Sequence, residues 1–186
     1  MATPPVFSVG QYNTAAYMNS IGLWLVKTAT LSGTSTNIAN CFTSDFDNYR
    51  VVLGDLDVSV NTTQTIGIQY SANGTPAGSG YEWWTQFIYS GGSGTEGGTA
   101  ATSWQLAYYS GDNEETGSLT IDVFSPKLSK YTHGMAQTFA YQAGAGGYVL
   151  RLSGGVLKNT NSYDGLTFVS SSGSMSGNVK IYGYRN

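Results

Sequence analysis

Apolar and polar side chains alternate along much of this chain with a period of two, not the longer period of a helix. The alternation is clearest over residues 64–70 and 119–124. A period of two places every second side chain on the same face of a β-strand. About ten such short segments follow one another, separated by glycine-bearing turns, with no long helical run between them. The pattern predicts an all-β fold, a single antiparallel β-sandwich that is jelly-roll-like.

The expected strands are short, and most end at Gly, Asn or Ser. They cover residues 22–31, 38–42, 49–60, 64–70, 81–89, 104–109, 119–124, 135–141, 148–152, 166–169 and 179–184. Residues 104–109 and 119–124 flank an acidic segment, so we expect them to pair as a hairpin. Residues 91–102 are rich in Gly, Ser and Thr, and we expect a flexible loop there. The apolar run at 23–26 indicates a strand covered on both faces.

Residues 49–60 predict one long, bent strand. Up to Leu53 the apolar side chains occupy odd positions, and from Leu56 onward they occupy even positions. A shift of one residue exchanges the buried and exposed faces of a strand, so this change requires an extra residue or a bend. Gly54 lies at the change, and glycine is common in β-bulges. We therefore expect a bulge at Gly54.

The first 21 residues form a separate unit in this interpretation, an N-terminal anchoring arm before the sandwich domain at 22–186. Two prolines keep its start extended, and a short helix is expected over residues 15–18. Two turns of helix are marginal alone, so the arm is expected to pack against its own domain or a neighbour. The residues expected to anchor it are Val6, Phe7, Tyr12, Tyr17 and Met18.

Composition excludes several classes of partner. Charged residues make up 10% of the 186 residues, the net charge is −3, and there is no basic cluster. We therefore expect no nucleic-acid ligand. The longest apolar run is too short to cross a bilayer, so no membrane insertion is expected. Cys41 is the single cysteine, which excludes an internal disulfide. The first residues lack the features of a signal peptide, so we expect synthesis in a cytosol.

Residues suited to catalysis are sparse. His133 is the only histidine, and no serine lies in the sequence context of a nucleophile elbow. A glycosidase needs two positioned carboxylates, and only Glu82 lies beside an aromatic pair in the sequence. We therefore expect no catalytic residues, no cofactor and no metal ligands. A binding or structural role remains.

Aromatic side chains supply the candidate binding surface. Adjacent strand residues point to opposite faces, so if Trp83 fills the core then Trp84 faces outward. Exposed aromatics on a surface with little charge are typical of interfaces with protein or carbohydrate. The candidate glycan or partner surface consists of Trp84, Tyr109 and Glu82. The alternative is that a second layer of the same chain covers these aromatics.

Three sequence blocks carry a family resemblance: GLWLVKT at 22–28, FTSDFDNYR at 42–50 and NVKIYGYRN at 178–186. In this order they resemble a group of virion proteins that are frequent in cyanophages and other tailed phages of aquatic hosts. Residues 61–165 are similar to that group only in general character and contain none of the three matching blocks. Residues 11–21 also resemble segments that tether such modules to a larger fibre. The resemblance implies a non-enzymatic virion structural protein, a tail fibre or host-attachment module.

The same resemblance implies partners and a location. The partners would be other phage virion proteins, with host surface glycan as a further ligand, and the module would assemble as a homotrimer. The protein would reside in the virion after assembly in the host cytoplasm. One alternative is a capsid decoration protein, a cement or knob, because the chain is short and has no shaft. Another is a free carbohydrate-binding module, which needs Trp84 and Tyr109 beside Glu82 or Glu115 in one cleft.

Overall fold

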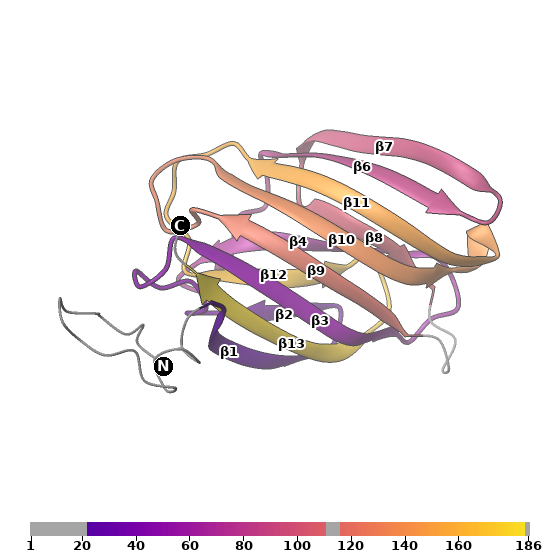
Figure 1. The fold of residues 1–186 in the computed structure, drawn as a ribbon, viewed down its shortest axis with the longest axis horizontal. Helices are drawn as coiled ribbons and strands as arrows, with labels where there is room; N and C mark the ends of the chain where they lie inside the picture. The colour runs from indigo at the N-terminus through magenta and orange to yellow at the C-terminus, as the bar shows by residue number, and fades with distance from the viewer. Residues whose placement is uncertain (1–21, 111–115, 185–186) are drawn as a thin grey trace.

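The computed structural model describes residues 22–110 and 116–184, which form two antiparallel β-sheets packed face to face (Figure 1). The expected arm and its short helix lie outside the described residues, together with Glu115. The same holds for the anchoring residues Val6, Phe7, Tyr12, Tyr17 and Met18. Among the described residues, no helix is long and apolar enough to cross a membrane.

The larger sheet has eight strands and the smaller sheet has five. In spatial order the larger sheet contains β1 (Trp24–Leu31), β13 (Met175–Tyr184), β3 (Asn48–Val58), β9 (Gly117–Phe124), β10 (Thr132–Gln142), β11 (Gly147–Leu157), β6 (Tyr81–Tyr89) and β7 (Gly92–Ala101). The smaller sheet contains β2 (Ser35–Ile38), β12 (Gly165–Ser170) and β4 (Gln64–Ala72), and then β5 (Thr75–Pro76) and β8 (Trp104–Tyr109), which both pair with β4. A single 3₁₀ turn, η1 (Ala143–Ala145), joins β10 to β11.

Eight of these strands form a jelly roll. In the larger sheet β1, β13, β3 and β9 lie in this order, and in the smaller sheet the matching order is β2, β12, β4 and β8. Among these eight strands, each strand is followed along the chain by one in the other sheet, except that β4 and β8 share the smaller sheet. This is the double Greek-key path of that fold. The predicted all-β, jelly-roll-like sandwich is therefore confirmed.

Two insertions enlarge the larger sheet. One lies between β4 and β8 and supplies β6 and β7, and the other lies between β9 and β12 and supplies β10 and β11. These four strands continue the larger sheet beyond β9, at the upper side of Figure 1. We call them the extension. Because the smaller sheet ends at β5 and β8, it covers less of the extension than of the jelly roll.

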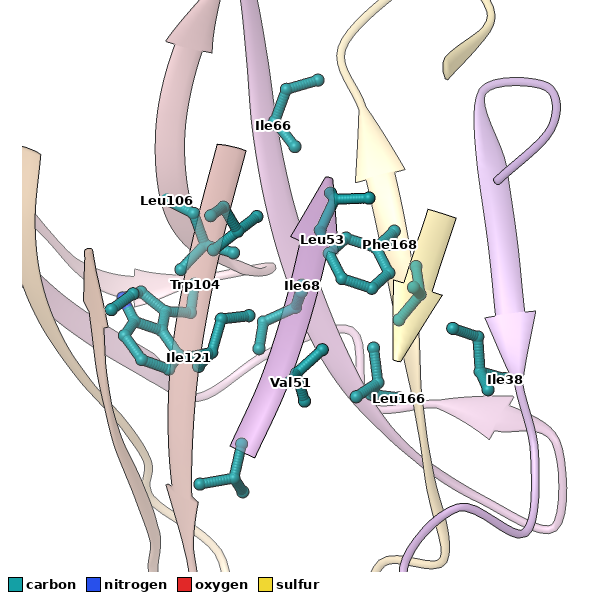
Figure 2. Packing of buried hydrophobic residues seen from close by; sticks show 14 of the residues in the cluster. Ile38, Val51, Leu53, Ile66, Ile68, Trp104, Leu106, Ile121, Leu166 and Phe168 are labelled. Atoms are coloured by element: carbon teal, nitrogen blue, oxygen red, sulfur yellow. The ribbon is translucent and has the colours of Figure 1, made fainter. Parts of the chain in front are cut away.

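The core is one layer of apolar side chains between the two sheets, as Figure 2 shows. Val51 and Ile121 of the larger sheet and Ile68 and Phe168 of the smaller sheet are completely buried. Burying one such side chain contributes about 1.5–3 kcal/mol. Cys41 is also buried, as a free thiol. The fold is thus held by apolar packing without a covalent cross-link.

The bent strand is β3, and its change of face is confirmed. Leu53 and Leu56 are both completely buried, and the pairing with β9 shifts register between them. Asp55 has a left-handed φ of 54°, whereas the φ of Gly54 lies outside that region and the space around its α-carbon is open. The bulge is therefore where it was expected, but Asp55 adopts the unusual backbone conformation, not Gly54.

Residues 91–102 are not the flexible loop that we expected, because they contain edge strand β7. Aromatic rings of the neighbouring strand β6 lie over the glycines of β7, where side chains are missing. Such cross-strand cover compensates for glycine in a strand. Three pairs do this: Trp83 over Gly98, Trp84 over Gly97 and Phe87 over Gly94.

The expected hairpin of residues 104–109 and 119–124 is also wrong. Strand β8 pairs with β4 in the smaller sheet, and β9 pairs with β3 and β10 in the larger sheet. Buried apolar side chains of the two strands, such as Leu106 and Ile121, are instead both part of the core between the sheets. The jelly-roll path thus places β8 and β9 in different sheets.

The first strand is covered on one side only. Leu25 in β1 is 47% exposed, and Leu23 just before the strand is 48% exposed. Among the described strands, β1 lies at the edge of the larger sheet and pairs only with β13. The expectation of a strand covered on both faces is therefore wrong for residues 23–26, because none of the described strands packs over the outward side.

Candidate functional site

Three adjacent strands of the extension expose apolar side chains on the side turned away from the smaller sheet. Trp84 and Met135 are the most exposed of them, at 66% and 65%. We call this surface the outer apolar face. It consists of Trp84 and Ile88 from β6, Met135 and Phe139 from β10, and Tyr148 and Leu152 from β11.

The strand register makes this surface continuous. Residues that are directly opposite in an antiparallel pair have β-carbons about 4.5–5.5 Å apart. Three rows cross the strands β10, β11 and β6: Met135–Gly154–Trp84, Gln137–Leu152–Gln86 and Phe139–Leu150–Ile88. The ring of Tyr148 stacks on Phe139, with centroids 5.0 Å apart and planes at 14°.

The opposite faces of the same strands fill the interior. Trp83 and Thr85 in β6 are buried, and so are Ala136 in β10 and Ser153 in β11. The alternation of these strands therefore places the large exposed side chains on one face and the buried side chains on the other. The outer face has no covering layer among the described residues, so the second-layer alternative does not apply to Trp84.

A polar border lies beside the outer apolar face. Arg50 of β3 and Asp122 of β9 are cross-strand partners, and their side chains form a bidentate ion pair with both N–O distances at 2.8 Å. This pair lines a shallow groove of about 440 Å³ together with Met135 and Leu152. An apolar centre with a polar rim is the usual arrangement of a protein interface.

On this face, Trp84 packs against the neighbouring strand β7. Its ring lies flat over Gly97 of β7, with its Cε3 atom 2.5 Å from where a β-carbon would stand on that glycine. Glu82, two residues earlier, points to the same side of β6. Its carboxylate accepts a hydrogen bond from Lys158 Nζ at 2.5 Å. The structure therefore places Trp84 and Glu82 on one face, with Glu82 already paired.

Tyr109 does not lie on this surface, because it is completely buried. The pairing of β8 with β4 shifts by one residue between Gln105 and Ala107. This irregularity changes the inward parity of β8, so that Tyr109 faces the core and Tyr108 does not. The cleft with Trp84, Tyr109 and Glu82 that a free carbohydrate-binding module was expected to need is therefore not formed.

A second cluster lies on the inner side of the extension, near η1. The guanidinium of Arg151 lies between the rings of Phe87 and Tyr108, at 4.9 and 4.7 Å from their centroids. Its Nη1 atom donates to the Glu96 carboxylate, and its Nη2 atom donates to Gln142 Oε1 at 3.0 Å. These groups border a cavity of about 250 Å³, which we call the arginine pocket.

Electrostatics in the arginine pocket follow from burial. The Arg151 side chain is only 4% exposed, and Glu96 supplies its counter-charge. Burial raises the pKa of Tyr108, and the negative charge of Glu96 raises it further. Sequence reasoning missed this cluster. The available indication was the position of Arg151 between Val149 and Ser153, because a charge on the buried face of a strand needs a partner.

Candidate catalytic chemistry is limited in the described part of the chain. His133 is exposed at the surface. No group of three or more His, Cys, Asp or Glu side chains in residues 22–110 and 116–184 is arranged to hold a metal ion. The two clusters described above can bind, one through apolar contact and the other through stacking and hydrogen bonds.

Comparisons with known proteins identify no family for this chain. No protein-family model matches this chain. No curated protein matches it either. Among solved structures, the CBM2 module of the evolved Dit of Lactobacillus casei BL23 phage J-1 aligns with 79% of this chain and 68% of its own. The identity is 8% and the TM-score is 0.23, values too low to carry an argument about this protein.

Proposed function

We propose that this protein is a non-enzymatic structural protein of a phage particle, of the tail-fibre or host-attachment type. It joins its neighbour in the particle through the outer apolar face. The observation that carries the proposal is this face, and the three sequence blocks similar to phage virion proteins support it. A homotrimer is the proposed form of the assembled module.

The chemistry of the outer apolar face favours a protein partner. Soluble monomers rarely expose large contiguous apolar patches, and such patches usually mark interaction sites. Ile88, Met135 and Leu152 offer no directional hydrogen bonds, so they suit a complementary apolar surface better than the hydroxyl groups of a glycan. The Trp84 ring, which packs over Gly97, and the stacked Phe139–Tyr148 pair add large aromatic contact area.

Incorporation into particles tests the proposal. The double variant Met135→Glu and Leu152→Glu places two charges on the face, and it should be absent from purified phage. Leu25→Glu is the matched control, because it adds a charge at a similarly exposed leucine on the far edge of the same sheet. Normal incorporation of the double variant, with unchanged thermal stability, would remove the outer apolar face as the attachment surface.

A capsid decoration protein is the second candidate. The described residues form one jelly roll with no shaft-like repeat, a form that suits a knob as well as a fibre tip. A maleimide label on Thr160→Cys separates the two roles, because Thr160 is exposed and the native Cys41 is buried. Label at the tail of intact virions supports attachment, and label spread over the head supports decoration.

A further inference from the structure

The arginine pocket is built from strands of both sheets. The inner side of the extension supplies Phe87, Glu96 and Arg151, and strand β8 of the smaller sheet supplies Tyr108. The backbone around Gly144, after β10, forms another wall. These strands are parts of the packed sandwich, so the side chains around the pocket keep fixed positions.

Arg151 is immobilised from four directions. Two aromatic rings enclose the guanidinium, the Glu96 carboxylate accepts from Nη1, and the Gln142 amide oxygen accepts from Nη2. Its charge is therefore neutralised within the pocket by Glu96. An anionic ligand would meet the carboxylate and a cationic ligand would meet the guanidinium, so the balance of charge favours a neutral ligand.

Hydrogen-bonding capacity remains in Gln142 and Glu96, besides the buried Arg151 Nε, which has no hydrogen-bond partner among the described residues. A guanidinium only donates, so the oxygen of the Gln142 amide must face Arg151. The Gln142 amide nitrogen makes no hydrogen bond within the described residues and can donate to a ligand. An ionised carboxylate accepts about four hydrogen bonds, so Glu96 can still accept from a ligand as well. A group with donor and acceptor character in one place, such as a hydroxyl, fits this pair.

Aromatic surface completes the pocket. The rings of Phe87 and Tyr89 are stacked, with centroids 6.4 Å apart and planes at 27°. Each ring rests on a glycine, Phe87 on Gly94 and Tyr89 on Gly91, and both are only half-buried. Their exposed area can pack against the C–H groups of a ligand, while Glu96 and Gln142 address its polar groups.

We propose that the arginine pocket binds a single neutral sugar ring. A sugar ring combines hydroxyl groups that both donate and accept with an apolar C–H face, and these features match the polar and aromatic sides of the pocket. The volume of about 250 Å³ is below the roughly 300–1,000 Å³ typical of pockets for drug-sized ligands. It therefore suits one ring, such as the end of a glycan chain, with the remainder of the glycan outside.

This inference rests on the proposed attachment role for its biological meaning, but the two surfaces are separate. The arginine pocket is on the inner side of the extension and the outer apolar face is on the opposite side of the same strands. A module that is docked through its outer face would keep the pocket free. Sugar binding and particle incorporation can therefore fail independently.

Ligand titration of the purified full-length chain tests the proposal. Methyl glycosides of neutral hexoses and N-acetylhexosamines are added while amide signals are followed by NMR, including the Gln142 side-chain amide. We expect saturable shifts at Gln142 and Gly144 with at least one sugar. Tyr89→Ala should weaken that affinity by about tenfold, the scale of one lost stacking contact. Trp84→Ala on the opposite face should leave it unchanged.

Other outcomes overturn the proposal. Absence of shifts with every neutral glycoside excludes a sugar site, whatever the result of particle incorporation. Loss of binding in Trp84→Ala, but not in Tyr89→Ala, assigns the sugar to the outer apolar face instead. Preference for a glycoside bearing a carboxylate contradicts the charge argument. If Tyr89→Ala does not fold, Tyr89→Leu replaces it, since this change removes the aromatic ring and retains an apolar side chain at the half-buried position.

Discussion

The indole ring of Trp104 lies so close over Gly155 that a β-carbon on that glycine would overlap it. Gly134, the partner of Gly155 across β10 and β11, faces the same ring in the same way. The indole nitrogen donates to Ser153 Oγ at 2.9 Å. Two paired glycines of the extension thus form a hollow, and a tryptophan of the jelly roll fills it. This contact fastens the inserted strands to the rest of the fold.

Gly155→Ala should therefore destabilise the protein by about 1–3 kcal/mol or more, because overpacking a filled core forces displacements. Gly154→Ala is the matched control, because a β-carbon on Gly154, the residue before Gly155, meets open space. Its effect should stay within about 0.5 kcal/mol. Urea unfolding of the two variants measures both values. Equal stability of the two would mean that Trp104 moves aside without cost.

The jelly roll could be predicted from the sequence because its strands carry their own alternation. In β3 even the change of face between Leu53 and Leu56 was visible as a change of parity. The strand β7 could not be predicted in this way. Its glycines have no side chains to alternate, and they are stabilised by rings from β6, such as Trp84 over Gly97. That information lies on another strand.

The candidate sites, like the fold, could be predicted only in part from the sequence. The outward direction of Trp84 could be argued from its neighbour Trp83, but the burial of Tyr109 depends on an irregularity in β8 that the sequence does not reveal. The outer apolar face and the arginine pocket both require β6 to lie beside β11. These strands come from two separate insertions, and only their pairing brings Trp84 near Met135 or Glu96 near Arg151.

The bulge in β3 gives a second prediction. Asp55→Val should destabilise the protein by about 1–2 kcal/mol, because a β-branched residue is strained at the left-handed φ of 54°. Gly54→Val, one residue earlier, should have little effect, since its φ is not left-handed and a β-carbon there meets open space. Thermal unfolding of the pair measures the difference. A larger loss for Gly54→Val would place the bulge strain on the glycine after all.

Two ion pairs should respond very differently to the same substitution. Glu96→Gln removes the counter-charge of Arg151, whose side chain is 4% exposed, and should cost on the order of 3 kcal/mol. Glu82→Gln removes the partner of Lys158, whose side chain is 45% exposed, and should cost about 0–1 kcal/mol. Denaturant unfolding at low and high salt measures both losses. A small loss for Glu96→Gln would show that water reaches the guanidinium.

Cys41 should be unreactive in the native protein. It is completely buried, and burial raises the pKa of its thiol from 9.0 to about 12. Because the thiolate is the reactive form, a thiol reagent should modify the chain only as fast as it unfolds. The measurement compares labelling rates in buffer and in denaturant. Rapid labelling of the folded protein would show that the region around Cys41 opens locally.

The same buried groups predict a loss of stability at alkaline pH. Folding holds the Cys41 thiol in its protonated form, so this group contributes fully below its unfolded pKa of 9.0, and the contribution is lost as pH rises toward about 12. Burial also raises the pKa of Tyr49 and Tyr70 from the ordinary 10.0. The two tyrosines therefore also lose their contribution to stability as the pH rises, but at a higher pH than Cys41. The free energy of unfolding should therefore decline above about pH 9. In Cys41→Ala the decline should begin later, where only tyrosines ionise. Urea unfolding across alkaline pH tests this difference, and identical curves for the two proteins would show that Cys41 does not contribute.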